Sequence, residues 1–212
     1  MHRRHALLSL TFPATALAQS QDIAPANPVD SVAAYVIPTD NISEQAAAVI
    51  ARALTKDTGL WIKSTLWTPS GEMEPFPGTN QYPAEDYFAL GASAMKLLRD
   101  ASVRTYFIVL TDRDINSKSR NFRYQYSMHS PMARTSVLSI ARLQHEKDGS
   151  LAPGDVVATR AAKMLLRIVG EMRLGWRRTA DPTDLMYAPL TSIEDIDRMS
   201  LIHTVQRRRQ AK

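Results

Sequence analysis

The fold of this chain is limited first by an apolar run at residues 105–112, TYFIVLTD. The run is rich in β-forming residues and polar residues end it, so it predicts a strand. Similar segments predict strands at 32–37, 60–67 and 135–143. Residues 122–128, FRYQYSM, alternate apolar and polar side chains, as an edge or half-exposed strand does.

Apolar residues recur at helical spacing in other segments. Asn41 and Glu44 resemble a capping box for a first helix, which Gly59 would end. A second helix is expected to begin at Pro83, because proline is tolerated in the first turn of a helix. The polar residues 113–120 predict a loop. The stripe of the second helix that we expect to be buried consists of Tyr87, Leu90, Ala94, Leu97 and Leu98.

Two helices are predicted after the strands. Asp155 can cap the first, which would run to about Leu174 before Gly175 terminates it. Ser192 and Asp195 form a capping box for the last helix. The residues of this last helix that we expect to point inward are Ile196, Met199 and Ile202.

The order strand, helix, strand, helix, three strands, helix, helix predicts one α/β domain with a mixed sheet over residues 32–204. The 212 residues of the chain suffice for one ordinary domain with a sizeable core. The chain has no cysteine, so disulfides and thiolate zinc sites are excluded and stability must come from the core.

The N-terminal part of the chain differs in composition from this domain. Residues 1–18 resemble a secretory signal, with Arg3 and Arg4 before an apolar run and an Ala-Leu-Ala cleavage site. Residues 19–31 are rich in proline, alanine and asparagine and predict a linker. We therefore expect an exported, periplasmic or secreted, soluble protein without a membrane span.

The net charge sets limits on the partners. The whole chain carries a formal charge of +5, of which Arg3 and Arg4 supply two, so the mature domain is only mildly basic. The tail at 205–212 supplies four positive charges by itself. Such a tail either touches nucleic acid or anionic lipid or lies in solvent, and we favour the solvated tail.

Five short motifs follow one another along the predicted domain. NQYPAEDYFALGASAMKLL spans 80–98, and YFIVLTDRDI begins at Tyr106. NFRYQYSM and SVLSIARL follow, and LMYAPLTSIEDIDR spans 185–198. In this order and spacing the motifs resemble the archaemetzincins, a branch of the metzincin metalloproteases. They resemble the family's Gln-Tyr segment, its central strands, and its Met-turn with the last helix.

The resemblance covers about residues 32–200 and implies an α/β, metzincin-like single domain. Such a domain has a mixed twisted sheet, two or three packing helices, a Met-turn, here at Met186 and Tyr187, and a C-terminal helix. The family's zinc motif is His-Glu-x-x-His-x-x-Gly-x-x-His. Two histidines one helical turn apart bind the zinc, and the glutamate acts as general base on the zinc-bound water.

The resemblance places this motif at the end of the predicted helix 155–174, because the spacing from its glycine to Met186 then fits the family. The residues at the first histidine, the glutamate, the second histidine, the glycine and the third histidine are Ile168, Val169, Met172, Gly175 and Arg178. No zinc ligand and no general base remain in this register. We therefore expect no catalytic residue and no bound zinc, although zinc is the cofactor of the family.

Two further comparisons with the family concern the same region. Its two cysteines that flank the Met-turn, part of a second zinc site, correspond to Thr179 and Asp184. An alternative register makes Glu171 the glutamate and places Gly170 and Leu174 at histidine positions. This register supplies no ligand either and shortens the distance to the Met-turn, so we prefer the first.

Other polar residues of the domain carry side chains of the types that bind metals. Asp112 and Asp114 follow a predicted strand, and we favour a turn there over a carboxylate site. Glu171 is a lone acid near the former zinc position, without an identified catalytic partner. The histidines of the domain lie in different segments, which favours surface or polar-network roles over metal binding. They are His129, His145 and His203.

Arginine and tryptophan residues also gather near the former zinc position. The arginines either line a cleft for an anionic peptide or polymer, or form a solvated face, which we favour. They are Arg167, Arg173, Arg177 and Arg178. We expect Trp61, Trp67 and Trp176 to pack in the core or the cleft.

The sequence thus predicts an exported archaemetzincin-like protein that has lost its zinc ligands and does not cleave peptides. Its inherited cleft would bind a peptide or protein at the edge strand 122–128. Two alternatives stay open. One is an active peptidase that uses non-standard ligands or no metal, and the other is a basic protein that binds an anionic polymer through residues 207–212.

Overall fold

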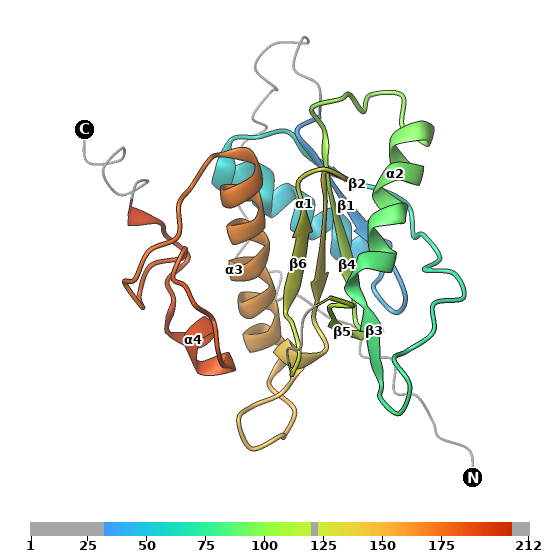
Figure 1. Cartoon of the computed structure of the whole chain (residues 1–212). Coiled ribbons are helices and arrows are strands. Elements are labelled where there is room, and N and C mark those ends of the chain that lie inside the picture. Colours follow the sequence, from blue (N-terminus) through green and yellow to red (C-terminus); the bar gives the residue numbers. More distant parts are fainter. Residues whose placement is uncertain (1–31, 120–122, 205–212) are drawn as a thin grey trace, which may run out of the picture.

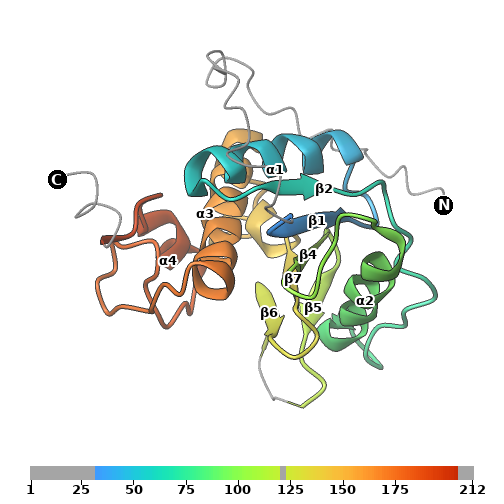
Figure 2. The ribbon, with the colours of Figure 1, turned by 90° about the horizontal axis from the view of Figure 1, so that it is seen from above.

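The computed structural model describes residues 32–119 and 123–204 (Figure 1). The signal predicted at 1–18, the linker at 19–31 and the tail at 205–212 lie outside these residues. A central sheet lies between two layers of helices (Figure 2). Helices α1 (Glu44–Thr58) and α3 (Gly154–Arg173) cover one face, and α2 (Phe88–Leu97) covers the other. Within the described ranges, none of the helices combines the length and apolarity needed to cross a membrane.

The central sheet has five strands. Four run parallel to one another, and the fifth lies at one edge and is antiparallel to its neighbour. In sheet order they are β2 (Ile62–Ser64), β1 (Ala34–Pro38), β4 (Tyr106–Thr111), β7 (Thr135–Ser139) and β6 (Ser127–Ser130). The predicted mixed sheet with an edge strand is therefore confirmed.

Some strand boundaries differ from the prediction. The edge strand β6 begins at Ser127, so it overlaps the predicted segment 122–128 only at Ser127 and Met128, and Phe122 is outside the described ranges. β2 is shorter than the predicted segment 60–67. The strand predicted at 135–143 ends earlier, at Ser139, because the chain turns into the short 3-10 helix η3 (Arg142–Gln144).

Successive residues of each strand point into two separate cores. Ala34, Ile108 and Leu138 face the core that includes α1 and α3. Tyr35 and Phe107 face the smaller core that α2 covers. The strand β4 is buried along its whole length, as expected for an apolar run that helices cover on both faces.

The cap of α1 differs from the predicted one. Ser43, and not Asn41, is the N-cap, because its side chain accepts a hydrogen bond from the backbone N–H of Ala46 at 3.1 Å. The Asn41 side chain instead donates to the carboxylate of Asp112 at 2.7 Å, beyond the end of β4. The Asn41 side chain therefore bonds to the distant Asp112 instead of to the nearby N-terminus of α1. Gly59 ends the helix in the left-handed conformation, as predicted.

A two-stranded sheet precedes α2 and corrects two predictions. β3 (Gln81–Pro83) pairs in parallel with β5 (Asp114–Asn116), which lies inside the segment that predicted a loop. Pro83 therefore ends a strand, and a 3-10 turn, η2 (Ala84–Tyr87), separates it from the helix. The pairing uses backbone groups of two distant segments, so neither segment shows it by composition.

The buried stripe of α2 also differs from the predicted one. Tyr87 is fully buried, but Leu97 is 81% exposed. The helix approaches β7 at Gly91, where an added Cβ would lie 2.1 Å from Oγ1 of Thr135. Leu98 still packs against the smaller core, whereas the neighbouring Leu97 faces solvent.

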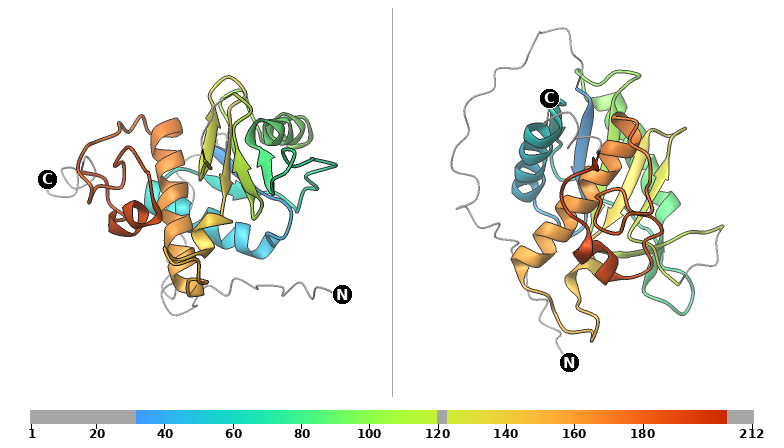
Figure 3. Two further views of the ribbon diagram at one scale, coloured as in Figure 1. Left: turned by 60° about the horizontal axis from the view of Figure 1, so that its bottom comes forward. Right: turned by 90° about the vertical axis from the view of Figure 1, so that its left-hand side faces the viewer.

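α3 crosses between the sheet and the C-terminal segment (Figure 3). Its N-cap residue is Pro153, and no side chain caps the helix, so the predicted Asp155 cap is wrong. Asp155 lies in the first turn instead, where a negative charge is favourable near the helix N-terminus. The helix ends at Arg173, close to the predicted boundary.

The last helix, α4 (Ile193–Arg198), follows the capping box of Ser192 and Asp195, as predicted. Ile196 and Met199 are buried. Ile202 is 40% exposed, so its predicted inward position is wrong. The reason is that the helix has ended before this residue, and the helical spacing no longer applies.

Candidate functional site

The C-terminal half of α3 packs into the larger core at the positions matched to the zinc motif. Ile168 is 1% exposed and Val169 is fully buried, and both belong to the core shared with the sheet and α1. Met172 is partly buried and packs against the same core. The hydrocarbon side chains of isoleucine and valine carry no metal-binding atom, so these two positions contribute packing.

The chain turns sharply where α3 ends. Gly175 adopts a φ of 67°, as its predicted role of terminator requires. The backbone N–H of Trp176 donates to the carbonyl of Gly170 at 2.9 Å. The Trp176 ring covers Gly170 so closely that an added Cβ would lie 2.0 Å from the ring. The same turn brings the ring beside His203, with ring centroids 5.2 Å apart.

Arg178 lies beyond this turn at the protein surface. Its Nη2 is 3.2 Å from Oε1 of Glu171, and the two side chains are 57% and 26% exposed. A guanidinium stays protonated and has no free electron pair for a metal. At the position matched to the third histidine, the chain therefore has one half of a surface ion pair.

Arg167 is buried, which corrects its predicted place on a solvated face. It is 8% exposed, and its Nη1 donates to the carbonyl oxygens of Leu185 at 2.6 Å and Tyr187 at 2.7 Å. Burial, with a contribution from the nearby Arg178, lowers the pKa of Arg167 to about 10, so it stays charged at neutral pH. Through this cation, α3 holds the loop that contains the fully buried Met186.

Asp184 holds the same loop from its other side. Its Oδ1 accepts from the Met186 N–H at 2.7 Å and from Nδ1 of His203 at 2.8 Å. Its Oδ2 accepts from the backbone N–H of Thr204 at 2.7 Å and from the Thr204 hydroxyl. Burial by itself raises the pKa of Asp184, but these hydrogen bonds outweigh it and the pKa is about 2. Thr179 adds a backbone hydrogen bond to the Met186 carbonyl at 3.1 Å.

The structure does not bring the three histidines together. His145 faces the Gly149 carbonyl at 3.2 Å in an exposed loop, and His203 is engaged by Asp184. His129 lies on β6. Over residues 32–119 and 123–204, no group of three or more His, Asp or Glu side chains is placed to hold a metal ion.

His129 lies near the C-terminal end of α3, a relationship that the sequence did not indicate. Its Nδ1 is 2.8 Å from Oγ of Ser136, which is 3.0 Å from the hydroxyl of Tyr106. Burial lowers the pKa of His129 to about 4, although the charge of Glu171 acts in the opposite direction. The imidazole is therefore neutral at pH 7. The period-two spacing of two strands could have paired His129 with Ser136, but no local signal links either to Glu171.

The acids after β4 are engaged within the fold, and two of the tryptophans are exposed. Asp112 accepts hydrogen bonds from the loop after β1. Asp114 begins β5, so the predicted turn is wrong there, and its carboxylate accepts two hydrogen bonds from the Arg142 guanidinium, at 2.9 and 2.6 Å. Trp61 and Trp67 are 39% and 47% exposed, so their predicted packing in the core or the cleft is wrong.

No protein-family model and no curated protein sequence matches this chain. Solved structures with a similar fold include a zinc-dependent peptidase from Methanocorpusculum labreanum. Its TM-score is 0.67 at 17% identity, over 84% of this chain and 100% of that one. Archaemetzincins from Archaeoglobus fulgidus and Methanopyrus kandleri have TM-scores of 0.59 and 0.58, each at 17% identity. They match 82% and 87% of this chain over 96% and 99% of their own.

The chain therefore has an archaemetzincin-like fold, as its motifs predicted. Its mixed α/β architecture, with a mostly parallel sheet and several packing helices, is that of these structures. At this level of identity the likeness establishes the fold, and this chain's own residues decide the chemistry of its site.

Proposed function

We propose that this archaemetzincin-like protein has lost the zinc chemistry of the fold and binds a peptide or protein along β6. One observation carries the proposal. Ile168, at the position matched to the first zinc-binding histidine, is 1% exposed and is part of the larger core. A side chain that packs there stabilises the fold without a metal.

The side chains at the matched positions do not fit zinc. Zinc in proteins is bound by imidazole, thiolate or carboxylate groups. Ile168 and Val169 offer none of these, and the thioether of Met172 suits softer metals. Arg178 brings a permanent positive charge, which opposes a bound cation.

The loop matched to the Met-turn is held by hydrogen bonds that need no metal. Arg167 binds two carbonyl groups on either side of Met186, and Asp184 binds the Met186 N–H. Thr179 and Asp184 correspond to the family's cysteines of a second zinc site. Their hydrogen bonds support the view that polar contacts have taken over a structural role of zinc.

β6 offers an open edge for a ligand. Within the described part of the chain, its ladder is formed with β7 alone. The Tyr126 carbonyl accepts from the Ser139 N–H at 2.9 Å, so by antiparallel alternation Met128 also bonds toward β7. Ser127 and His129 then direct their backbone groups to the open side. An extended peptide can add there as a further strand.

Binding is tested with a library of extended peptides and fluorescence polarisation. We expect saturable binding that Ser127→Pro abolishes, because proline removes the N–H directed to the open side of β6. Ser127→Ala is the matched control, since it alters the same side chain and keeps that N–H. A library without any saturable binder would sink the proposal, as would equal affinity for the parent and Ser127→Pro.

The loss of zinc chemistry is tested separately. The untagged chain is exposed to excess zinc, dialysed and analysed for metal per chain, and the same sample is assayed for peptide cleavage. We expect no stoichiometric zinc and no cleavage. Tightly held zinc together with chelator-sensitive cleavage would establish the competing peptidase reading. His129→Ala, His145→Ala and His203→Ala, each measured alone, would then identify the ligands.

The proposal includes export, which rests on the signal-like residues 1–18. Expression with fractionation and N-terminal sequencing is expected to yield a chain that begins at Gln19 outside the cytoplasm. An intact N-terminus in the cytoplasmic fraction would contradict this part of the proposal and leave the binding site unaffected.

A further inference from the structure

One end of the molecule gathers segments that are distant in sequence. It is the end at which the parallel strands begin, since Ala34 pairs with Tyr106 and Phe107 pairs with Thr135. The last turns of α1, α2 and α3 reach this end as well (Figure 1). We refer to residues 55–63, 94–104, 131–134 and 170–178 together as the strand-start end.

The strand-start end has a strong excess of positive charge. Its acids are Asp57, Asp100 and Glu171. Its cations are Lys56, Lys63, Lys96, Arg99, Arg104, Arg134, Arg173, Arg177 and Arg178. Nine cations and three acids leave a charge of +6, which exceeds the +5 of the whole chain. The positive charge of the protein is therefore concentrated at this end.

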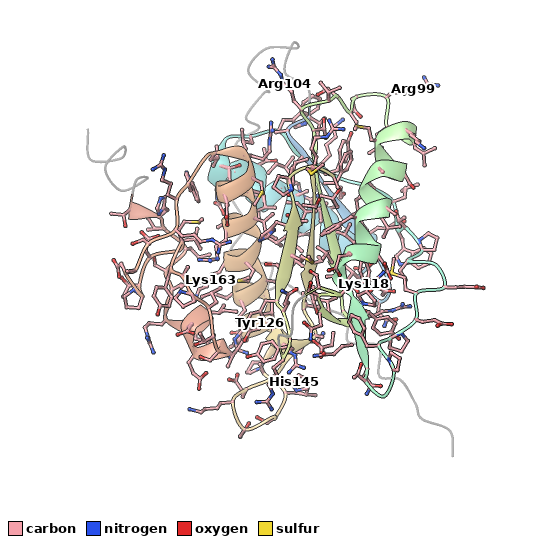
Figure 4. The ribbon with its side chains drawn as sticks, in the orientation of Figure 1. Arg99, Arg104, Lys118, Tyr126, His145 and Lys163 are labelled. Atoms are coloured by element: carbon pink, nitrogen blue, oxygen red, sulfur yellow. The ribbon has the colours of Figure 1, made fainter. Side chains whose placement is uncertain are left out.

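Several of these cations are available to a partner. Asp100 is engaged by Lys63 and by the hydroxyl of Tyr35. Among the described residues, no carboxylate forms an ion pair with Arg99 or Arg104. Figure 4 shows both arginines at this end of the molecule, well away from His145 at the other.

Large apolar side chains are exposed among these cations. Leu97 is 81%, Val103 is 79% and Met132 is 98% exposed, and they come from α2 and from two separate loops. Arg134 ties these segments together: its guanidinium donates to the Val103 carbonyl and lies 3.3 Å from Sδ of Met95. The apolar tips are thus held at one end of the fold by a common contact.

We propose that the strand-start end docks on an anionic lipid bilayer. Cations near such a surface are attracted to its headgroups, with about a fivefold gain in partitioning for each one. Exposed aliphatic tips add binding by entering the boundary between headgroups and acyl chains. A nucleic acid or another anionic polymer would use the cations but would leave Val103 and Met132 without a role. The apolar tips therefore favour the lipid surface.

The test is vesicle flotation of the full chain. Flotation is compared between vesicles of phosphatidylcholine and vesicles that also contain phosphatidylglycerol. We expect binding to the anionic vesicles alone, weakened by salt. Val103→Asp/Met132→Asp should lower binding about tenfold or more, through lost insertion and added negative charge. Leu151→Asp is the matched control, because Leu151 is 62% exposed in the loop before α3, at the other end.

Charge is tested with Arg99→Glu/Arg104→Glu, for which we expect a loss of about twentyfold or more. Each variant is first shown to have the urea midpoint of the parent. Equal flotation of the parent and Val103→Asp/Met132→Asp would overturn the proposal, as would flotation with neutral vesicles. Loss of binding on deletion of residues 205–212 alone would assign the contact to the tail. Retention on heparin without flotation would make an anionic polymer the partner.

Discussion

Nη1 of Arg167 lies 2.6 Å from the carbonyl oxygen of Leu185 and 2.7 Å from that of Tyr187. The buried Arg167 of α3 thus holds the loop around Met186. In the sequence, Arg167 immediately precedes Ile168, which is the position matched to the first zinc-binding histidine. The two carbonyl groups accept hydrogen bonds from the guanidinium. These bonds offset the free-energy cost of burying each polar group without a partner. In this chain, these two hydrogen bonds join the helix to the loop.

Arg167→Met should lower the free energy of unfolding by about 3 kcal/mol or more, because it leaves two buried carbonyl groups without their charged donor. Arg178→Met is the control, since it removes only one half of an exposed ion pair and should change stability by less than about 1 kcal/mol. Urea unfolding at pH 7 measures both. Equal effects of the two substitutions would show that the hydrogen bonds of Arg167 around Met186 contribute nothing specific to stability.

Asp184 should make stability fall in acid. Its pKa is about 2 in the folded protein, below the ordinary value of 3.8. A lowered folded-state pKa contributes stability above pH 4, and this contribution is lost as the pH falls from about 4 to about 2. The free energy of unfolding that is lost in this way amounts to about 2 kcal/mol. Urea unfolding of the parent and Asp184→Asn at pH 7 and pH 2.5 measures it, and we expect a smaller pH dependence in the variant. Identical pH dependence of the parent and Asp184→Asn would show that Asp184 is not responsible for the loss of stability in acid.

Gly170→Ala should displace Trp176. An added Cβ would lie 2.0 Å from the indole, so the ring must move, at a cost of about 1 to 3 kcal/mol. Gly154→Ala is the control, because it meets no atom within 4 Å and replaces glycine in a helix. Thermal unfolding with tryptophan fluorescence is expected to show a lower midpoint and altered emission for Gly170→Ala only. An unchanged emission spectrum and midpoint would mean that the close contact is absent.

Zinc binding should return when ligands are restored in the Gly175 register. Ile168→His/Met172→His/Arg178→His is expected to take up one zinc per chain and to unfold at a higher temperature with zinc than without it. Gly170→His/Leu174→His, which follows the alternative register, is the comparison and should show neither effect. Because Ile168 is in the core, Met172→His/Arg178→His is measured as well, with weaker zinc binding expected. Zinc uptake by the alternative register alone would reject the alignment on Gly175.

Much of the architecture was predictable because it depends on local periodicity. The apolar run of β4, the helical spacing of α1 and α3, and the capping box at Ser192 each lie within one segment. The positive φ of Gly175 was predictable for the same reason, since glycine adopts it without steric cost. The zinc motif could therefore be placed at the end of α3 from the spacing between Gly175 and Met186, without knowledge of distant contacts.

Other features depend on partners that lie far away in the chain. Ser43 caps α1 while Asn41 bonds to the distant Asp112, and β3 pairs with the distant β5. A helical stripe predicts which residues share a face, but not which edge of that face is covered, so Leu97 faces solvent while Leu98 packs against the core.

The sequence by itself determined the order of strands and helices and the residue types at the matched positions. The tertiary structure decided that Arg167 is buried and that His129 lies near α3. An arginine is normally exposed because its charge is costly to bury. Only the folded chain brings the carbonyls of Leu185 and Tyr187 to its guanidinium and compensates that cost.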